Sequence, residues 1–154
     1  MRKIVCKKKL KAFSLFEILI TIGVLLALSS IVFPLTVAKV QEVKLKSHAS
    51  ELVTDIYLLQ QEAYYKGSPR GVSFTSHGYT LFDGEDLSTA TEKNSKTLPN
   101  NLSITSISFS TNQEFYFPMN EFKPSESGYV ILTDGFHSII VNINSEGLIE
   151  YGNI

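Results

Sequence analysis

An uncharged, largely apolar stretch of 21 residues, from Ile18 to Ala38, constrains this chain more than any other feature. At 1.5 Å per residue, a helix of this length measures about 30 Å, which matches the hydrocarbon core of a bilayer. The stretch is therefore long enough to span a membrane as a single helix.

Charged residues are distributed unevenly on the two sides of this stretch. The first twelve residues contain six basic residues and no acidic one, whereas the rest of the chain has eight basic and fifteen acidic residues. By the positive-inside rule, the basic leader stays in the cytoplasm and the chain after Lys39 lies outside. The acidic remainder argues against a nucleic-acid binder that relies on general basicity.

Two simpler interpretations of the N-terminal region are a cleaved secretory signal and an uncleaved anchor. The apolar run is longer than a typical signal h-region, and no A-x-A cleavage site ends it. An uncleaved anchor needs only the charge asymmetry and the length, but it leaves Glu17 unexplained. An ionised carboxylate at the edge of a bilayer core is costly unless it is paired. The single cysteine, Cys6, lies in the leader, so the body of the chain can form neither a disulfide nor a thiolate metal site.

The basic leader, a small residue, Phe-Ser-Leu-Phe-Glu at positions 13–17 and about twenty apolar residues follow one another in that order. This arrangement resembles the class III signal of type IV pilins and pseudopilins. The resemblance implies that a prepilin peptidase cleaves between Ala12 and Phe13 and methylates the new amino group of Phe13. Residues 1–12 would be removed, and residues 13–38 would remain as a membrane and filament-core helix. The family usually has glycine where Ala12 stands, so we expect slower processing.

The same resemblance implies roles for Glu17 and Pro34. In a filament core, the Glu17 carboxylate would pair with the terminal amine of Phe13 on a neighbouring subunit. In a low-dielectric core this attraction is large enough to select one axial register, although both charges must be desolvated. Pro34 matches a proline common in the family and is expected to kink or locally melt the helix.

Beyond Pro34 the pattern becomes that of an amphipathic helical stem over residues 39–66. Its apolar positions recur at intervals of three and four residues: Ala49, Leu52, Val53, Ile56, Leu59 and Ala63. Gly67, Ser68 and Pro69 are expected to end the helix. Because an amphipathic helix must bury its apolar face, we expect it to pack on a sheet formed within residues 67–154.

Short alternating runs predict the strands of that sheet. The expected strands are 71–74, 79–82, 102–109, 114–117, 129–133, 138–142 and 148–151, and the polar stretch from Asp83 to Asn101 is expected to be a loop. The predicted fold is α+β: a long N-terminal helix, membrane-spanning in its first half and amphipathic in its second, packed on a small antiparallel β-sheet head.

The C-terminal segment GYVILTDGFHSIIVNINSEGLIEYG resembles that of minor pseudopilins of the H type and of related type IV minor pilins. Some relatives on the pilus side bind DNA through basic residues after the last glycine of this region. Here Leu148, Ile149 and Glu150 follow Gly147, so DNA binding is not expected.

The remaining candidate sites are weak. The three histidines, His48, His77 and His137, lack the paired spacing of a zinc site. Calcium binding in the 83–101 loop is left open, because Asp83, Glu85 and Asp86 lie in an acidic segment without the full ligand spacing of a known loop. No serine has a general base near it in the pattern, so nucleophilic catalysis is not supported. Neither an enzymatic activity nor a cofactor is expected.

These features predict a minor pilin or pseudopilin, a structural subunit of a type IV pilus, a competence pseudopilus or a type II secretion pseudopilus. The expected partners are other pilins or pseudopilins, a prepilin peptidase, an inner-membrane assembly platform and the membrane itself. The expected location is the inner membrane, crossed once with an extracytoplasmic head, and then the filament. The alternative is a membrane-anchored extracytoplasmic binding protein, such as an adhesin or a DNA receptor, whose helix is only a tether.

Overall fold

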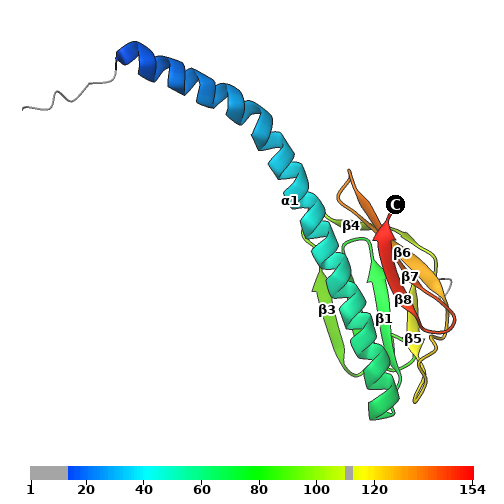
Figure 1. The fold of residues 1–154 in the computed structure, drawn as a ribbon. Coiled ribbons are helices and arrows are strands. Elements are labelled where there is room, and N and C mark those ends of the chain that lie inside the picture. The colour runs from blue at the N-terminus through cyan, green and yellow to red at the C-terminus, as the bar shows by residue number, and fades with distance from the viewer. Residues whose placement is uncertain (1–13, 110–112) are drawn as a thin grey trace, which may run out of the picture. The chain divides into compact units, whose positions relative to one another are not determined.

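A computed structural model describes residues 14–109 and 113–154, apart from the side chains of residues 31–36 and 38. The chain divides into two compact units, Met1–Lys39 and Val40–Ile154, and we call the second the head unit. The described elements are labelled in Figure 1. They are α1 (Leu15–Lys66), β1 (Arg70–Thr75), β2 (Gly78–Asp83), β3 (Lys93–Thr97), β4 (Ser103–Ile107), β5 (Glu114–Phe117), β6 (Gly128–Thr133), β7 (Ser138–Ile143) and β8 (Ile149–Asn153).

Helix α1 ends at Lys66, directly before the glycine that the sequence marks as its stop. Gly67 has φ +64°, a left-handed conformation that glycine adopts without a Cβ penalty at the end of a helix. One of the last helical carbonyls, that of Ala63, accepts a hydrogen bond from the backbone N–H of Asn120 at 3.1 Å. The loop after β5 therefore holds the end of the helix.

The strands form two four-stranded antiparallel sheets, where a single small sheet was predicted. The strand orders are β3-β2-β1-β5 and β4-β6-β7-β8. The backbone N–H of Ile104 in β4 donates to the carbonyl of Ser76 in the β1–β2 turn at 2.9 Å, which places the two sheets next to each other. The alternation of apolar and polar residues along a strand indicates which face is buried, but it does not identify the neighbouring strand. The division of the strands into two sheets could therefore not be predicted. The α+β class itself is confirmed.

The prediction that residues 83–101 form only a loop is wrong, because β3 lies within it. β3 pairs antiparallel with β2 from Gly78↔Thr97 to Phe82↔Lys93. Its residues, Lys-Asn-Ser-Lys-Thr, are exposed except for a half-buried Lys96. An edge strand of this kind has a hydrogen-bonded neighbour on one side only, and lysines on such an edge oppose pairing with another chain. β3 therefore lacks the alternation of apolar and polar residues by which a strand is recognised in a sequence.

The core of the head unit lies between the second half of α1 and the two sheets. All six apolar stem positions predicted to face the sheet are buried, each at most 8% exposed, and Leu45 extends their row by one turn. From the sheets, Phe74, Phe109 and Phe115 stack on one another, with ring centroids 4.7 to 6.2 Å apart. The amphipathic character predicted for the stem is confirmed.

Turns at Ser76–Gly78, Asp134–Gly135 and Ser145–Gly147 connect β1 to β2, β6 to β7 and β7 to β8.

Candidate functional site

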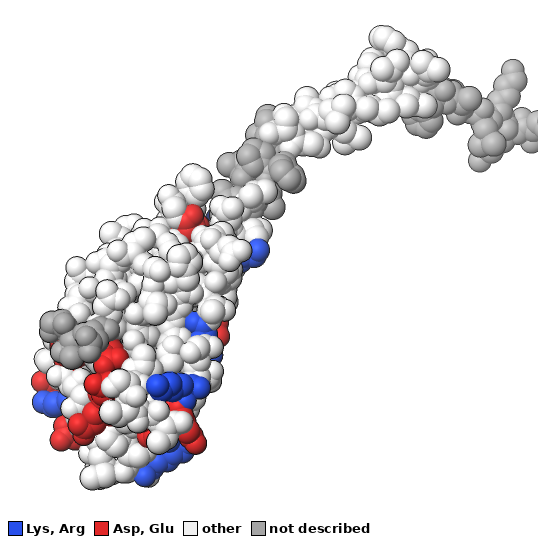
Figure 2. Space-filling view, turned by 180° about the vertical axis from the view of Figure 1, so that it is seen from behind, with Lys and Arg blue, Asp and Glu red and all other residues white. Residues whose placement is uncertain are grey.

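The N-terminal part of α1 exposes large apolar side chains on all of its faces. Ten of them between Leu15 and Leu28 are 48–77% exposed: Leu15, Phe16, Ile18, Leu19, Ile20, Ile22, Val24, Leu25, Leu26 and Leu28. Figure 2 shows no acidic or basic side chain on the described atoms of this stretch on the face drawn. Because 3.6 residues make one turn, one flat partner surface cannot cover such a helix. A helix that is apolar all round needs apolar surroundings on every side.

Three described hydroxyl groups in and just after this part of α1 are satisfied within the helix. Thr21 Oγ1 donates to the carbonyl of Ile18 at 2.8 Å, Ser29 Oγ to that of Leu25 at 2.7 Å, and Ser30 Oγ to that of Ala27 at 2.8 Å. Burying a hydroxyl in an apolar medium is costly only when it has no hydrogen-bond partner. These three polar residues are therefore compatible with an apolar environment. Within the part of the chain that the structure describes, no helix is long and apolar enough to cross a membrane.

Glu17 lies in the first turn of α1, where it has a local role that was not predicted. The carbonyl of Ser14 accepts hydrogen bonds from the backbone N–H groups of Glu17 at 3.0 Å and Ile18 at 3.2 Å. Ser14 and Glu17 have the S-x-x-E spacing of a capping box, and a carboxylate in the first turn interacts favourably with the helix dipole. The serine three positions before Glu17 was the signal for this role.

The other predicted site residues are Ala12, Phe13 and Pro34. Ala12 and Phe13 lie outside the described residues. Pro34 lies within α1, but its side chain is not described, so the predicted kink stays a prediction. The pairing of Glu17 with Phe13 was predicted between two subunits, and a single chain does not test it.

A polar cluster joins α1 to the first sheet. The Tyr79 hydroxyl donates to Asp55 Oδ2 at 2.6 Å, and Lys96 Nζ lies 2.8 Å from the same oxygen and 3.0 Å from Glu51 Oε1. Burial, followed by the hydrogen bond to Asp55, raises the pKa of Tyr79 well above its ordinary value. The hydrogen bond to Asp55 is also the largest cause that raises the pKa of Lys96. The cluster fixes the otherwise polar strand β3 against the helix.

Gln60 is a polar residue in the buried face of α1, and its amide links the helix to two loops. Its Nε2 donates to the carbonyl of Phe122 at 2.7 Å and to that of Gly147 at 2.8 Å. One turn earlier, the Tyr57 hydroxyl donates to the carbonyl of Ile149 at 3.1 Å. The second half of α1 is thereby bonded to the loop after β5, the β7–β8 turn and the first residue of β8.

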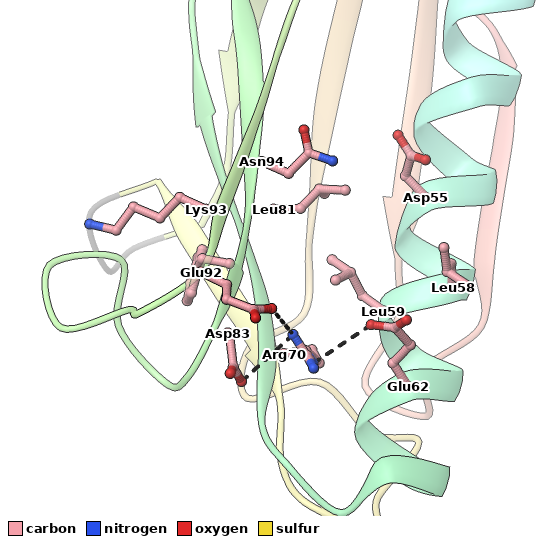
Figure 3. Close-up of a pocket in the computed structure, with 11 residues that line it drawn as sticks. Asp55, Leu58, Leu59, Glu62, Arg70, Leu81, Asp83, Glu92, Lys93 and Asn94 are labelled. Atoms are coloured by element: carbon pink, nitrogen blue, oxygen red, sulfur yellow. Dashed lines mark ion pairs between the residues drawn. The ribbon is translucent and has the colours of Figure 1, made fainter.

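Arg70 lies beside a cavity of about 320 Å³ between α1 and the β2 and β3 strands (Figure 3). Its guanidinium is 3.6 Å from Glu62, 3.7 Å from Asp83 and 3.9 Å from Glu92. These distances are long for hydrogen bonds, and the buried Arg70 Nε has no hydrogen-bond partner among the described residues. The arginine therefore acts mainly as a charge that neutralises the acidic side chains around it.

The acidic residues considered for calcium do not converge on one point. Asp83 faces Arg70, whereas the Asp86 carboxylate accepts the backbone N–H of Ser88 at 2.6 Å, and this bond lowers the pKa of Asp86. No group of three or more potential ligands that could hold a metal ion occurs among residues 14–109 and 113–154. The histidines also lie apart: His48 is 3.4 Å from Glu51, His77 is 2.9 Å from Ser76 and His137 is 3.1 Å from Asp134.

No protein-family model matches this chain, and no curated protein sequence matches it. Among solved structures, the crystal structure of the type IV minor pilin FimU of Pseudomonas aeruginosa is similar, with a TM-score of 0.53 and 13% sequence identity. The likeness covers 73% of this chain and 90% of that one. At this identity it shows a shared fold, so the predicted pilin-like architecture is confirmed. The finer resemblance to H-type pseudopilins stays a prediction.

Proposed function

We propose that this chain is a minor pilin or pseudopilin, a structural subunit that assembles into a filament through the N-terminal half of α1. The observation that carries the proposal is the apolar surface of that half. Ten large apolar side chains are about half exposed or more, and the hydroxyl groups of Thr21, Ser29 and Ser30 bond to the helix itself. Such a surface is stable when it is surrounded by lipid tails or by other apolar helices. A subunit that moves from a membrane to a filament core meets both.

The likeness to FimU supports this proposal at the level of the fold. The proposal extends to removal of residues 1–12 by a prepilin peptidase, N-methylation of Phe13, an inner-membrane assembly platform and other pilins as partners. The filament is a type IV pilus, a competence pseudopilus or a type II secretion pseudopilus. Before assembly, the stretch from Ile18 to Ala38 would span the inner membrane, with the head unit on the extracytoplasmic side.

Mass spectrometry of the protein from its own host tests the processing step. The expected mature chain begins at Phe13 and carries one methyl group on its terminal amine. A mature chain that retains the segment from Met1 to Lys11 would overturn the prepilin interpretation.

Glu17 provides the sharper test of assembly, because its two roles can be separated. Glu17→Leu removes both the charge and the capping-box side chain, whereas Glu17→Gln removes the charge and keeps a side chain that serves in a capping box. If the carboxylate pairs with the terminal amine of Phe13 on a neighbour, both variants leave one buried charge unpaired at a cost of about 3–5 kcal/mol. Both should then insert into the membrane and be processed, but fail to co-purify with the other pilins.

The outcomes of this pair of variants distinguish three roles for Glu17. Failure of both variants supports pairing between subunits. Normal assembly of Glu17→Gln with failure of Glu17→Leu would show that Glu17 acts as a helix cap only. Normal co-purification and function of both would favour the alternative, a membrane-anchored binding protein whose helix is a tether.

A further inference from the structure

Strand β8, drawn in red in Figure 1, forms one edge of the second sheet, because it pairs with β7 on one side only. The N–H of Ile154, directly after β8, donates to the carbonyl of Ser138 in β7 at 3.1 Å. Residues that bond to the neighbouring strand alternate along an antiparallel ladder. The residues at positions 150 and 152 therefore also bond to β7, whereas the backbone groups of Tyr151 and Asn153 point away from it.

Each of the other described edge strands has a feature that closes its outer side. At β5, the N–H of Tyr116 donates to Ser125 Oγ at 3.1 Å, and the carbonyl of Tyr116 accepts the N–H of Ser125 at 2.7 Å. β4 bonds through the N–H of Ile104 to Ser76 in the first sheet, and β3 carries two lysines. Among the described strands, β8 lacks such a feature over most of its length.

The outer side of β8 is bonded at its first residue, where the Ile149 carbonyl accepts the Tyr57 hydroxyl at 3.1 Å. The outward N–H and C=O groups of Tyr151 and Asn153 have no hydrogen-bond partner within residues 14–109 and 113–154. Tyr151 is 48% exposed, and Asn153 is exposed as well. β8 therefore presents unpaired backbone groups to solvent, the arrangement to which an additional strand can bind.

Gly152 lies between these two residues, and the fold of the chain does not require a glycine there. Its φ is not among the positive values found in the turn glycines, and a Cβ at this position would meet no described atom within 4 Å. A glycine inside a strand weakens that strand, and it often marks a place where another backbone approaches closely. Gly152 is therefore a second observation that points to a partner at this edge.

The side chains around Gly152 indicate what the partner strand should carry. Gly152 lies opposite Ile140 in β7, which lies opposite Ile131 in β6, and both isoleucines are half-buried. An aromatic ring on an added strand opposite Gly152 would pack over the glycine onto Ile140. On the same face, Glu150 is the only charged residue of β8, and Ile154 is 71% exposed. Opposite these two residues, a basic and an apolar side chain would be favourable.

We propose that the open edge of β8 binds an extended segment of another polypeptide as an antiparallel fifth strand of the second sheet. The segment carries an apolar residue opposite Ile154, an aromatic residue opposite Gly152 and a basic residue opposite Glu150. Backbone hydrogen bonds to Tyr151 and Asn153 supply affinity, and the three side chains supply specificity. The inference goes beyond the proposed function and does not depend on it, because it involves the head unit alone.

The described edges of a second copy of this chain do not offer such a segment. A second β8 has Glu150 but no basic residue. The central lysine of the β3 edge, Lys96, is already held by Asp55 at 2.8 Å and Glu51 at 3.0 Å. The charge on β8 therefore favours a different polypeptide as the occupant.

Amide hydrogen exchange, measured by NMR on the full chain in detergent micelles, tests the proposal. The probe is an end-blocked peptide, Thr-Val-Thr-Phe-Thr-Lys-Thr, whose phenylalanine aligns with Gly152 in an antiparallel pairing. In the free chain, the amides of Tyr151 and Asn153 should exchange fast and that of Gly152 slowly, because only Gly152 bonds to β7. The peptide should slow the exchange of Tyr151 and Asn153 and leave that of Gly152 unchanged.

Two variants serve as controls. Tyr151→Pro removes an outward N–H, which an edge strand tolerates, and should abolish the effect of the peptide. Slow exchange at Gly152 in this variant reports that β8 is still paired with β7. A peptide with glutamate in place of lysine should protect the natural chain less than the lysine peptide does. Glu150→Lys should reverse this preference.

The outcomes separate this inference from the proposed function. Fast exchange of Tyr151 and Asn153 at every peptide concentration would overturn the inference and leave the proposed function intact, because that function rests on the apolar half of α1. Slow exchange of both amides without peptide would also overturn it. A dependence of this slow exchange on protein concentration would identify a second copy as the occupant, and no dependence would identify the chain itself. An unchanged peptide preference in Glu150→Lys would overturn the recognition of a basic residue.

Discussion

Gln60 lies among apolar residues on α1, and its amide is the donor for two loop carbonyls. Replacing it with leucine makes the position apolar and leaves the carbonyls of Phe122 and Gly147 without this donor. A buried acceptor that loses its partner costs about 1–3 kcal/mol. We expect Gln60→Leu to lower the free energy of unfolding in urea by that amount. The neighbouring Gln61 is exposed, so Gln61→Leu should change stability by no more than about 0.5 kcal/mol. Equal effects of both substitutions would contradict a specific role of the Gln60 amide.

Tyr79 is expected to make the head unit less stable at alkaline pH. Burial and the hydrogen bond to Asp55 raise its pKa in the folded head unit, whereas an unfolded tyrosine has a pKa of about 10. The stabilisation from the protonated phenol is therefore fully present below about pH 10 and is lost as the pH rises further, because the unfolded chain then releases a proton that the folded unit retains. The raised pKa of Lys96 acts in the same direction.

Tyr79→Phe tests this dependence. At neutral pH the variant should be less stable by about 1 kcal/mol, the net value of a hydrogen bond. Above pH 10 its stability should fall less steeply than that of the natural chain, with a residual slope from Lys96. Parallel pH profiles of the two proteins in urea unfolding would show that the Tyr79 proton is not linked to folding.

Among the elements of the fold, the second half of α1 was the most predictable from the sequence, because its burial follows a local period. Ala49, Leu52 and Ile56 lie on the same face of any regular helix. Gly67 ends the helix because its own backbone adopts a left-handed conformation. β3 was not predictable in this way. Its position depends on Lys96 reaching Asp55 and Glu51, more than forty positions earlier in the chain.

The polar contacts that organise the head unit could not be predicted for the same reason. The two acceptors of Gln60 are 62 and 87 positions away, and nothing near Gln60 in the sequence indicates them. Arg70 is surrounded by carboxylates from α1, the end of β2 and the residue before β3, which only the folded chain brings together. By contrast, the S-x-x-E spacing of Ser14 and Glu17 at the start of α1 is local and could have been recognised from the sequence.

Gly147, in the β7–β8 turn, has the closest neighbouring atoms of the turn glycines. Gly147 has φ +84°, and a Cβ there would overlap the carbonyl oxygen of Phe122 and lie 2.7 Å from Gln60 Nε2. Gly135 has a similar φ of +90°, but a Cβ at this position would have no described atom within 4 Å. Gly135→Ala should therefore cost only the left-handed backbone strain, about 1–2 kcal/mol. Gly147→Ala adds the clash and should cost clearly more. Thermal melts that give the same loss for both alanine variants would contradict this account.

The two units of the molecule differ in the surroundings that they require. The head unit buries its apolar side chains in a core of its own, whereas the described part of the first unit exposes large apolar side chains on every face. The head unit is also large enough to bury a core without help, since domains of about 100 residues commonly fold alone. Its stability should therefore not depend on the first unit.

A chain that begins at Lys39 tests this independence. It should remain monomeric without detergent and lose its circular dichroism signal in one cooperative thermal transition, because the second half of α1, both sheets and the Gln60 contacts are contained within it. A chain that begins at Phe13 should require detergent or lipid to stay monodisperse, since its extra residues are mostly apolar and Glu17 is the only charged side chain among them. A gradual, non-cooperative melt of the shorter chain would mean that the head unit needs the preceding residues to fold. A longer chain that stays monomeric in plain buffer would mean that its apolar stretch is covered by its own head unit, and assembly through that stretch would lose its physical basis.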